Sequence, residues 1–183
     1  MNQRHTFHRA RYVLSPLSAG IATLTSVLLL VGGSRAFAQS STPPTTMTRQ
    51  TLTSDGANLM VAAAAAHARE LGLSEVIAIY DESEILKALV SLDGARVTSV
   101  NFALDKAYTA ARRQAATQDL ADAFAAGPVV TMQSFLKQPR LTLLGGGLPI
   151  VVNGQGVGGI GASGGSIPQD IEVANAGLAA IQH

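Results

Sequence analysis

The chain contains no cysteine and no tryptophan, and only four of its 183 residues are histidine. Without cysteine it has no disulfide, no thiolate metal ligand and no cysteine nucleophile, so core burial or assembly must stabilise the fold. Two of the histidines lie near the start of the chain, which leaves His67 and His183. A zinc site built from several histidines and a Ser-His-Asp triad are therefore not expected, and the sequence points to no catalytic residue.

Residues 1–38 have the organisation of a cleavable signal peptide. Three arginines within the first 11 residues precede an apolar stretch over residues 21–31, and residues 36–38 read Ala-Phe-Ala, a small-x-small cleavage site. The apolar stretch is shorter than the roughly 20 residues that a membrane span needs. We therefore expect cleavage after Ala38 and export to the periplasm or the extracellular space, without stable membrane insertion; an uncleaved anchor is the alternative.

Removal of this segment reverses the sign of the net charge. Four of the 13 basic residues lie in it and none of the 12 acidic residues does, so the net charge changes from +1 to 9 − 12 = −3. A domain that binds nucleic acid presents a basic stripe or face. No nucleic-acid partner is therefore expected.

The rest of the chain divides into a flexible lead-in, residues 39–52, rich in Ser, Thr and Pro, and one domain over residues 53–183. Apolar spacing and end signals predict helices over residues 55–71, 97–114, 117–125 and 168–181, and strands over residues 75–80, 85–92, 148–152 and 157–162. Two further apolar runs, 129–135 and 141–144, are ambiguous. Strands paired in hairpins, with long helices between the hairpins, predict an α+β fold.

A glycine-rich segment near the C-terminus carries the strongest local signal. Asn153-Gly154 between two apolar runs predicts a hairpin with a type I′ turn, which needs positive φ at both central residues. Residues 154–159 also match Gly-x-Gly-x-x-Gly, but a hairpin lacks the strand–turn–helix context of dinucleotide binding. We interpret these glycines as serving turns and close strand packing. Residues 163–165, Ser-Gly-Gly before a helix, could present backbone N–H groups to an anion.

Polar and aromatic side chains gather on the predicted helix 97–114. Lys106, Tyr108 and Thr109 share one turn, and Arg112 and Arg113 follow one turn later. Arginines in this position could bind carboxylates, although a solvated or salt-bridged helix face is the alternative.

A second polar cluster, Asp81, Glu82 and Glu84, follows the first predicted strand. It is either a solvated hairpin tip or a weak oxygen-ligand cation site.

Several motifs, taken together, resemble those of one known family. Residues 105–111 read Asp-Lys-Ala-Tyr-Thr-Ala-Ala, and residues 146–154 read Gly-Gly-Leu-Pro-Ile-Val-Val-Asn-Gly. With residues 92–95, 158–164 and 169–170, they extend over nearly the whole domain. The pattern resembles the GlcG/HbpS-like family of haem-binding proteins, whose members also resemble the C-terminal domain of PduO-type corrinoid adenosyltransferases.

The resemblance implies a profilin-like sandwich, with a central antiparallel sheet of about five strands and helices packed on it. It also implies homo-oligomers, haem or a related tetrapyrrole as partner, and a ligand pocket faced by residues 106–109. The residues then expected at the cofactor are Lys106, Tyr108, Thr109, Arg112, Arg113 and Tyr80. Tyr108 is the expected haem-iron ligand, with His67 as the alternative.

The chain departs from the family pattern at one place. Where the family has an Asp-x-Gly-Gly-His-Leu turn, residues 81–86 place Ile85 at the histidine position. The function implied by the resemblance and the leader is an exported haem-binding protein that sequesters or senses haem. The alternatives are an oxidative haem-degrading or small-organic-acid accessory enzyme, and an oligomeric structural module without a cofactor.

Overall fold

The computed structural model describes residues 45–181, so the predicted signal peptide, residues 39–44 of the lead-in and His183 lie outside the described residues. The elements follow the order α1 (Ser54–Glu70), β1 (Val76–Asp81), β2 (Leu86–Ser91), α2 (Val97–Arg113), α3 (Thr117–Ala125), α4 (Val129–Leu136), β3 (Gly147–Val152), β4 (Gln155–Ser163) and α5 (Ile167–Ala179). Within this part of the chain, no helix is both long and apolar enough to cross a membrane.

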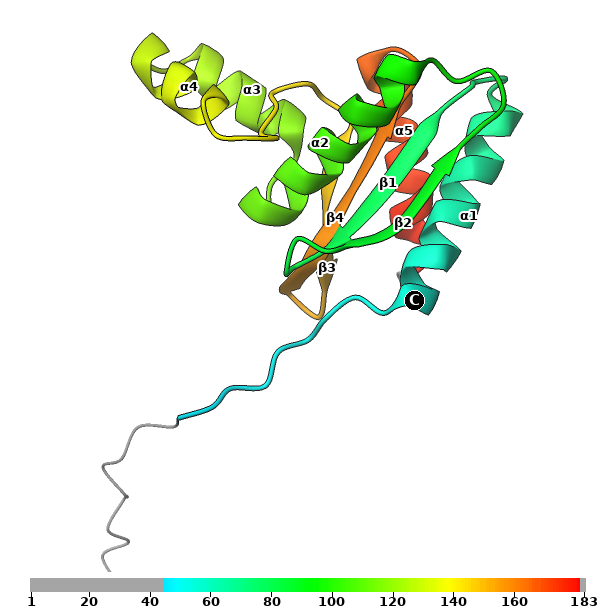
Figure 1. Ribbon diagram of the computed structural model, residues 1–183, viewed down its shortest axis with the longest axis horizontal. Helices are drawn as coiled ribbons and strands as arrows, with labels where there is room; N and C mark the ends of the chain where they lie inside the picture. Colours follow the sequence, from blue (N-terminus) through cyan, green and yellow to red (C-terminus); the bar gives the residue numbers. More distant parts are fainter. Residues whose placement is uncertain (1–44, 182–183) are drawn as a thin grey trace, which may run out of the picture. The chain divides into compact units, whose positions relative to one another are not determined.

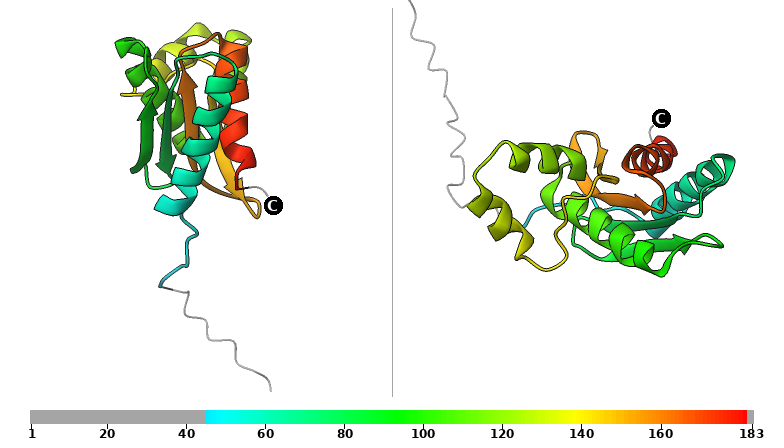
Figure 2. Two further views of the ribbon diagram at one scale, coloured as in Figure 1. Left: turned by 90° about the vertical axis from the view of Figure 1, so that its right-hand side faces the viewer. Right: turned by 90° about the horizontal axis from the view of Figure 1, so that it is seen from above.

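The sheet is antiparallel, with the strand order β2-β1-β4-β3. Helix α2 covers one face, and α1 and α5 cover the other (Figures 1 and 2). The central strand β1 is buried at all six positions, because Ile77 and Ile79 face α1 and α5 while Ala78 and Tyr80 face α2. Burial on both faces explains the weak alternation of this strand in the sequence. The predicted α+β architecture is confirmed.

The expectation of about five strands was wrong, because the described residues form a sheet of four. Of the two ambiguous apolar runs, residues 141–144 lie outside any strand and the other forms helix α4. Its β-branched start favours a strand locally, but Pro128 is the N-cap of a helix and Phe135 packs on Phe124 of α3, with ring centroids 4.8 Å apart. Tertiary packing therefore overrides local propensity in this run.

The glycine-rich hairpin forms as predicted. Asn153 and Gly154 have φ values of 51° and 76°, and Val152 pairs with Gln155 across the turn. Beyond the turn, the glycines of β4 let α2 pack directly on the strand. A Cβ atom at Gly159 would lie 2.5 Å from the carbonyl oxygen of Ala107, and one at Gly161 would lie 2.5 Å from that of Ala103. These glycines serve close packing, as the sequence interpretation held.

We expect Gly161→Ala to destabilise the fold by about 3 kcal/mol or more, because its methyl group would meet the rigid backbone of α2. Gly127→Ala is the matched control, since its Cβ would meet only an ordinary contact of 3.4 Å with the carbonyl oxygen of Ala123. Urea unfolding of both variants measures the difference. Equal stability of the two variants would contradict the close packing of α2 on β4.

Candidate functional site

Helix α2 divides the residues expected at the cofactor between two places. Lys106 points toward β4 and α5, where it is buried. Tyr108 and Arg112 lie near β1 and the turn after it, where they contact Tyr80 and Glu84. The shared helix therefore brings Tyr80, Tyr108 and Arg112 together and leaves Lys106 apart from them.

The first of these places is the tyrosine–arginine cluster, which we define as Tyr80, Tyr108, Arg112, Arg140 and Glu84. The rings of Tyr80 and Tyr108 meet edge to face, with centroids 5.8 Å apart. The guanidinium of Arg140 lies 5.1 Å from the Tyr80 ring centroid and 4.6 Å from that of Tyr108, and it donates a 2.6 Å hydrogen bond to the Tyr80 hydroxyl. One cation therefore holds two aromatic rings.

Glu84 closes the other side of the cluster. The Tyr108 hydroxyl donates a 2.6 Å hydrogen bond to Glu84 Oε2, and Arg112 Nη1 donates to both Glu84 oxygens, at 3.0 and 3.1 Å, and to the Tyr108 oxygen at 3.0 Å. The hydrogen bond to Glu84 raises the pKa of Tyr108 above its ordinary value, and burial adds to the effect. The phenol is therefore held protonated by a carboxylate that lies beside it.

Glu84 and Arg140 were not among the residues expected at the cofactor. Glu84 was placed in a hairpin tip or a cation site, but it turns toward Tyr108 and Arg112, and Asp81 accepts hydrogen bonds from the backbone of its own turn. Within residues 45–181, no group of three or more acidic or histidine side chains could hold a metal ion. Arg140 gave no sequence signal, because it lies 32 positions beyond Tyr108 in an irregular segment.

The other expected residues lie outside the cluster. Thr109 is fully buried and binds the loop that carries Arg140, accepting from Thr142 N at 3.0 Å and donating to Arg140 O at 3.3 Å. Arg113 stacks on Phe135, with 5.6 Å between the guanidinium and the ring centroid. His67, the alternative iron ligand, lies on α1 between Glu70 and Glu172. It belongs to the layer on the opposite face of the sheet from α2.

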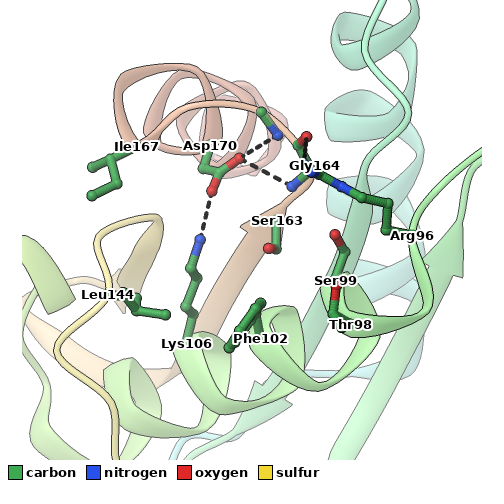
Figure 3. A pocket seen from close by; sticks show the side chains of 11 residues that line it. Arg96, Thr98, Ser99, Phe102, Lys106, Leu144, Ser163, Gly164, Ile167 and Asp170 are labelled. Carbon is green, nitrogen blue, oxygen red and sulfur yellow. Dashed lines mark hydrogen bonds and ion pairs between the residues drawn. The ribbon is translucent and has the colours of Figure 1, made fainter.

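The second place is a pocket of about 240 Å³ between the first half of α2 and the start of α5, with Lys106 and Asp170 at its floor (Figure 3). Lys106 Nζ lies 2.5 Å from Asp170 Oδ2 and donates to Ala162 O at 2.9 Å. Asp170 Oδ1 accepts from the N–H groups of Gly164 and Gly165. The predicted Ser-Gly-Gly anion cradle therefore holds an anion, but this anion is a side chain of the same protein.

A buried acid, Glu75, lies against the same Gly164-Gly165 turn. Neither of its carboxyl oxygens has a hydrogen-bond partner among the described residues. Burial, followed by the nearby charge of Asp170, raises its pKa from 4.5 to about 7. The folded protein therefore keeps a proton on Glu75 that the unfolded chain releases near pH 4.5.

This difference makes stability depend on pH. The stability that the protonated Glu75 contributes is fully present below about pH 4.5 and is lost as the pH rises to about 7, because only the unfolded chain releases the proton freely in that window. In the unmodified protein, the free energy of unfolding should fall by up to about 3 kcal/mol between these two pH values. We expect Glu75→Gln, which mimics the protonated acid, not to show this fall. Urea unfolding across pH 4.5–8 measures it. Asp93→Asn, at an exposed position, is the control, and an unchanged pH profile in Glu75→Gln would contradict the assignment.

Comparisons with known proteins agree with the fold and the motifs. Residues 52–179 match the family described as haem degrading protein HbpS-like. An uncharacterized 15.0 kDa protein of Citrobacter freundii is 34% identical over 128 residues, which are 70% of this chain and 90% of that protein.

Two solved structures share the fold at 29% sequence identity. A double mutant of HbpS from Streptomyces reticuli gives a TM-score of 0.70 and covers 81% of this chain and 99% of its own. A PduOC–haem complex gives a TM-score of 0.67 and covers 73% of this chain and 96% of its own. The match of the family over residues 52–179 extends across most of the chain. The chain belongs to the HbpS-like family.

Proposed function

We propose that this chain is an exported haem-binding protein and that the tyrosine–arginine cluster holds the haem. The observation that carries the proposal is the pairing of Tyr108 with Arg112 and Arg140 on one partly exposed surface. Membership of the HbpS-like family and the PduOC–haem complex at 29% identity support haem as the ligand. The leader-like first 38 residues support export.

The side chains of the cluster fit the chemistry of haem. A tyrosine oxygen is an established axial ligand of ferric haem, and arginines pair with carboxylates such as the propionates. Arg112 and Arg140 remain 43% and 39% exposed, so both can reach a ligand on the surface. A pocket of about 270 Å³ adjoins Arg112 and Glu84 and gives room beside the cluster. When bound, haem supplies a ferric iron that accepts an oxygen ligand.

Ligation of iron by Tyr108 would require the phenol to lose its proton. Glu84 opposes this loss, because it accepts the hydrogen bond from the phenol and raises its pKa. Arg112 already donates to the phenol oxygen, and so it stabilises the phenolate that remains. Ile85, which stands where the family has histidine, is 59% exposed and offers iron no ligand. We therefore assign ligation to Tyr108 and not to the turn.

Sequestering and sensing of haem both begin with this binding step, and both remain within the proposal. Assembly into homo-oligomers is part of it as well. A second copy of the chain would add a further wall beside a haem held at the partly exposed Arg112 and Arg140.

The test is a titration of the purified protein with haemin, followed by the Soret band. We expect saturable binding, with the charge-transfer spectrum of ferric haem bound to a phenolate. Tyr108→Phe should lose that spectrum and weaken binding about tenfold or more, because the oxygen ligand is removed while the ring remains. Glu84→Gln should lower the pKa of Tyr108 and extend phenolate ligation to lower pH, because the carboxylate that raises this pKa is gone.

His67→Gln is the matched control, because it removes the alternative iron ligand on the opposite face of the sheet. Its spectrum and affinity should equal those of the unmodified protein. If His67→Gln lost the spectrum of bound haem and Tyr108→Phe kept it, the iron ligand would have to be reassigned to His67 on α1. The absence of a Soret shift at micromolar protein would reject the proposed function.

The description of the matched family also favours a second candidate, oxidative degradation of haem. Incubation of the haem-loaded protein with a reductant, oxygen and catalase distinguishes the two functions. If the protein only binds haem, its Soret band should decay no faster than that of free haem under the same conditions. If the protein degrades haem, its Soret band should decay faster.

A further inference from the structure

We infer that the pocket floored by Lys106 and Asp170 binds the carboxylate of a short-chain acid through Arg96 and the first turn of α2. The inference does not rest on haem binding, because the pocket shares no lining residue with the tyrosine–arginine cluster. It rests on polar groups that the fold gathers around this pocket without giving them a partner.

The first turn of α2 has no side-chain cap, and of its first amides only Ser99 N–H is bonded within the turn, to Arg96 O at 2.9 Å. The N-cap residue is Arg96, no side chain caps the helix, and no acidic residue lies in the first turn. The first amides of a helix have no intrahelical partner, and the dipole there favours an anion. An arginine at this place adds positive charge where positive charge is unfavourable. A bound anion would compensate the helix and Arg96 together.

Helix α5 opens on the same pocket and shows the contrast. Its N-terminus has a capping box of Ser166 and Gln169, and the carboxylate of Asp170 accepts the N–H groups of Gly164 and Gly165. Asp170 also neutralises Lys106. The Asp170 carboxylate, the acidic side chain that lines this pocket, is therefore bonded to Lys106 and to the start of α5, and it does not compensate the N-terminus of α2.

Two serines that are largely buried, with no internal partner for their hydroxyls in the part of the chain that the structure describes, are the independent sign of a ligand. Ser99, in the first turn of α2, is 3% exposed, and Ser163, at the end of β4, is 6% exposed. Both line the pocket, and neither hydroxyl has a hydrogen-bond partner among residues 45–181. Figure 3 shows them approaching the same space from opposite elements. Both hydroxyls belong to residues that line the pocket, and neither is among the fully buried polar atoms without a partner, so both are open to a molecule in the pocket.

The charge of the site selects an anion. Arg96 forms no ion pair within the described part of the chain, and its Nη2 donates to Gly164 O at 3.1 Å, which holds the guanidinium at the pocket wall. A guanidinium presents its remaining donors in the planar fork that matches a carboxylate. Arg96, the N–H of Thr98 and the two serine hydroxyls can all donate to a molecule in the pocket. A ligand with one negative charge and hydrogen-bond acceptors would satisfy these donors.

Size and polarity select the rest of the ligand. The pocket volume of about 240 Å³ is below the range of about 300–1,000 Å³ typical of drug-sized ligands. Its mouth carries the apolar side chains of Phe102, Leu144 and Ile167, which remain 44%, 42% and 42% exposed. An acid with a short apolar chain would cover them, whereas sulfate or phosphate would not. The ligand class is therefore a monocarboxylate of a few carbons.

The test is calorimetric titration of the purified protein with butanoate, with butanamide as the neutral ligand of the same shape. We expect saturable millimolar binding of butanoate and none of butanamide. Arg96→Gln should weaken binding about tenfold or more, because a charge-assisted pair is lost. Ser99→Ala should weaken it about threefold to tenfold, the usual effect of one neutral hydrogen bond. Arg69→Gln, at an exposed arginine on α1, is the matched control and should bind normally.

A haem propionate has the same carboxylate chemistry, and a second arm separates the two sources. Protein saturated with haemin should bind butanoate with unchanged affinity, and Arg96→Gln should bind haemin normally. Competition between the two ligands, together with weaker haemin binding in Arg96→Gln, would assign the pocket to a propionate and overturn the inference. Absence of butanoate binding, or equal binding in Arg96→Gln and Arg69→Gln, would overturn it as well. Thermal melting of each variant checks its folding, and Ser99→Ala gives a second reading if Arg96→Gln is unstable.

Discussion

The buried ion pair between Lys106 and Asp170 is the constraint on which the two sites of this protein depend. It joins α2 to α5 across the end of β4, and these helices lie on opposite faces of the sheet. Burying two charges is unfavourable unless their remaining hydrogen-bonding capacity is met. Here Ala162 O, Gly164 N and Gly165 N meet it. Removal of either partner would leave an uncompensated buried charge, at a cost of about 3–5 kcal/mol.

The glycines of β4 determine how closely α2 lies to the sheet. Because Gly159 and Gly161 have no side chain, the helix backbone lies directly over the strand, and the small side chains of Ala103 and Ala107 fill the interface. A helix held this close cannot rotate without clashes, so its flanks keep fixed directions. One flank carries Arg96, Ser99 and Phe102 toward the pocket, and the other carries Tyr108 and Arg112 toward β1. A single packed interface therefore positions both sites.

Much of this was readable from the sequence, and the failures have one physical cause. The hairpin at Asn153-Gly154 and the long helices depend on local conformational preferences, which a sequence displays directly. Helix α4 was missed because the contact between Phe124 and Phe135 outweighs the β-branched start of the run. The partners of Lys106 and Tyr108 were missed for the related reason that they are distant in sequence: Asp170 lies 64 positions away and Glu84 lies 24 positions away. The residue types alone predict that α2 carries a polar site. Which charged group each side chain contacts depends on the fold.

The two sites differ in how their charges are arranged, and this difference bears on how each would bind. In the tyrosine–arginine cluster each arginine already has a carboxylate partner, since Glu84 accepts hydrogen bonds from Tyr108 and Arg112 and Asp105 accepts one from Arg140. A ligand must displace these bonds and a proton, so binding there depends on pH through Tyr108. At the start of α2, donors outnumber acceptors, and a carboxylate would add bonds without breaking any.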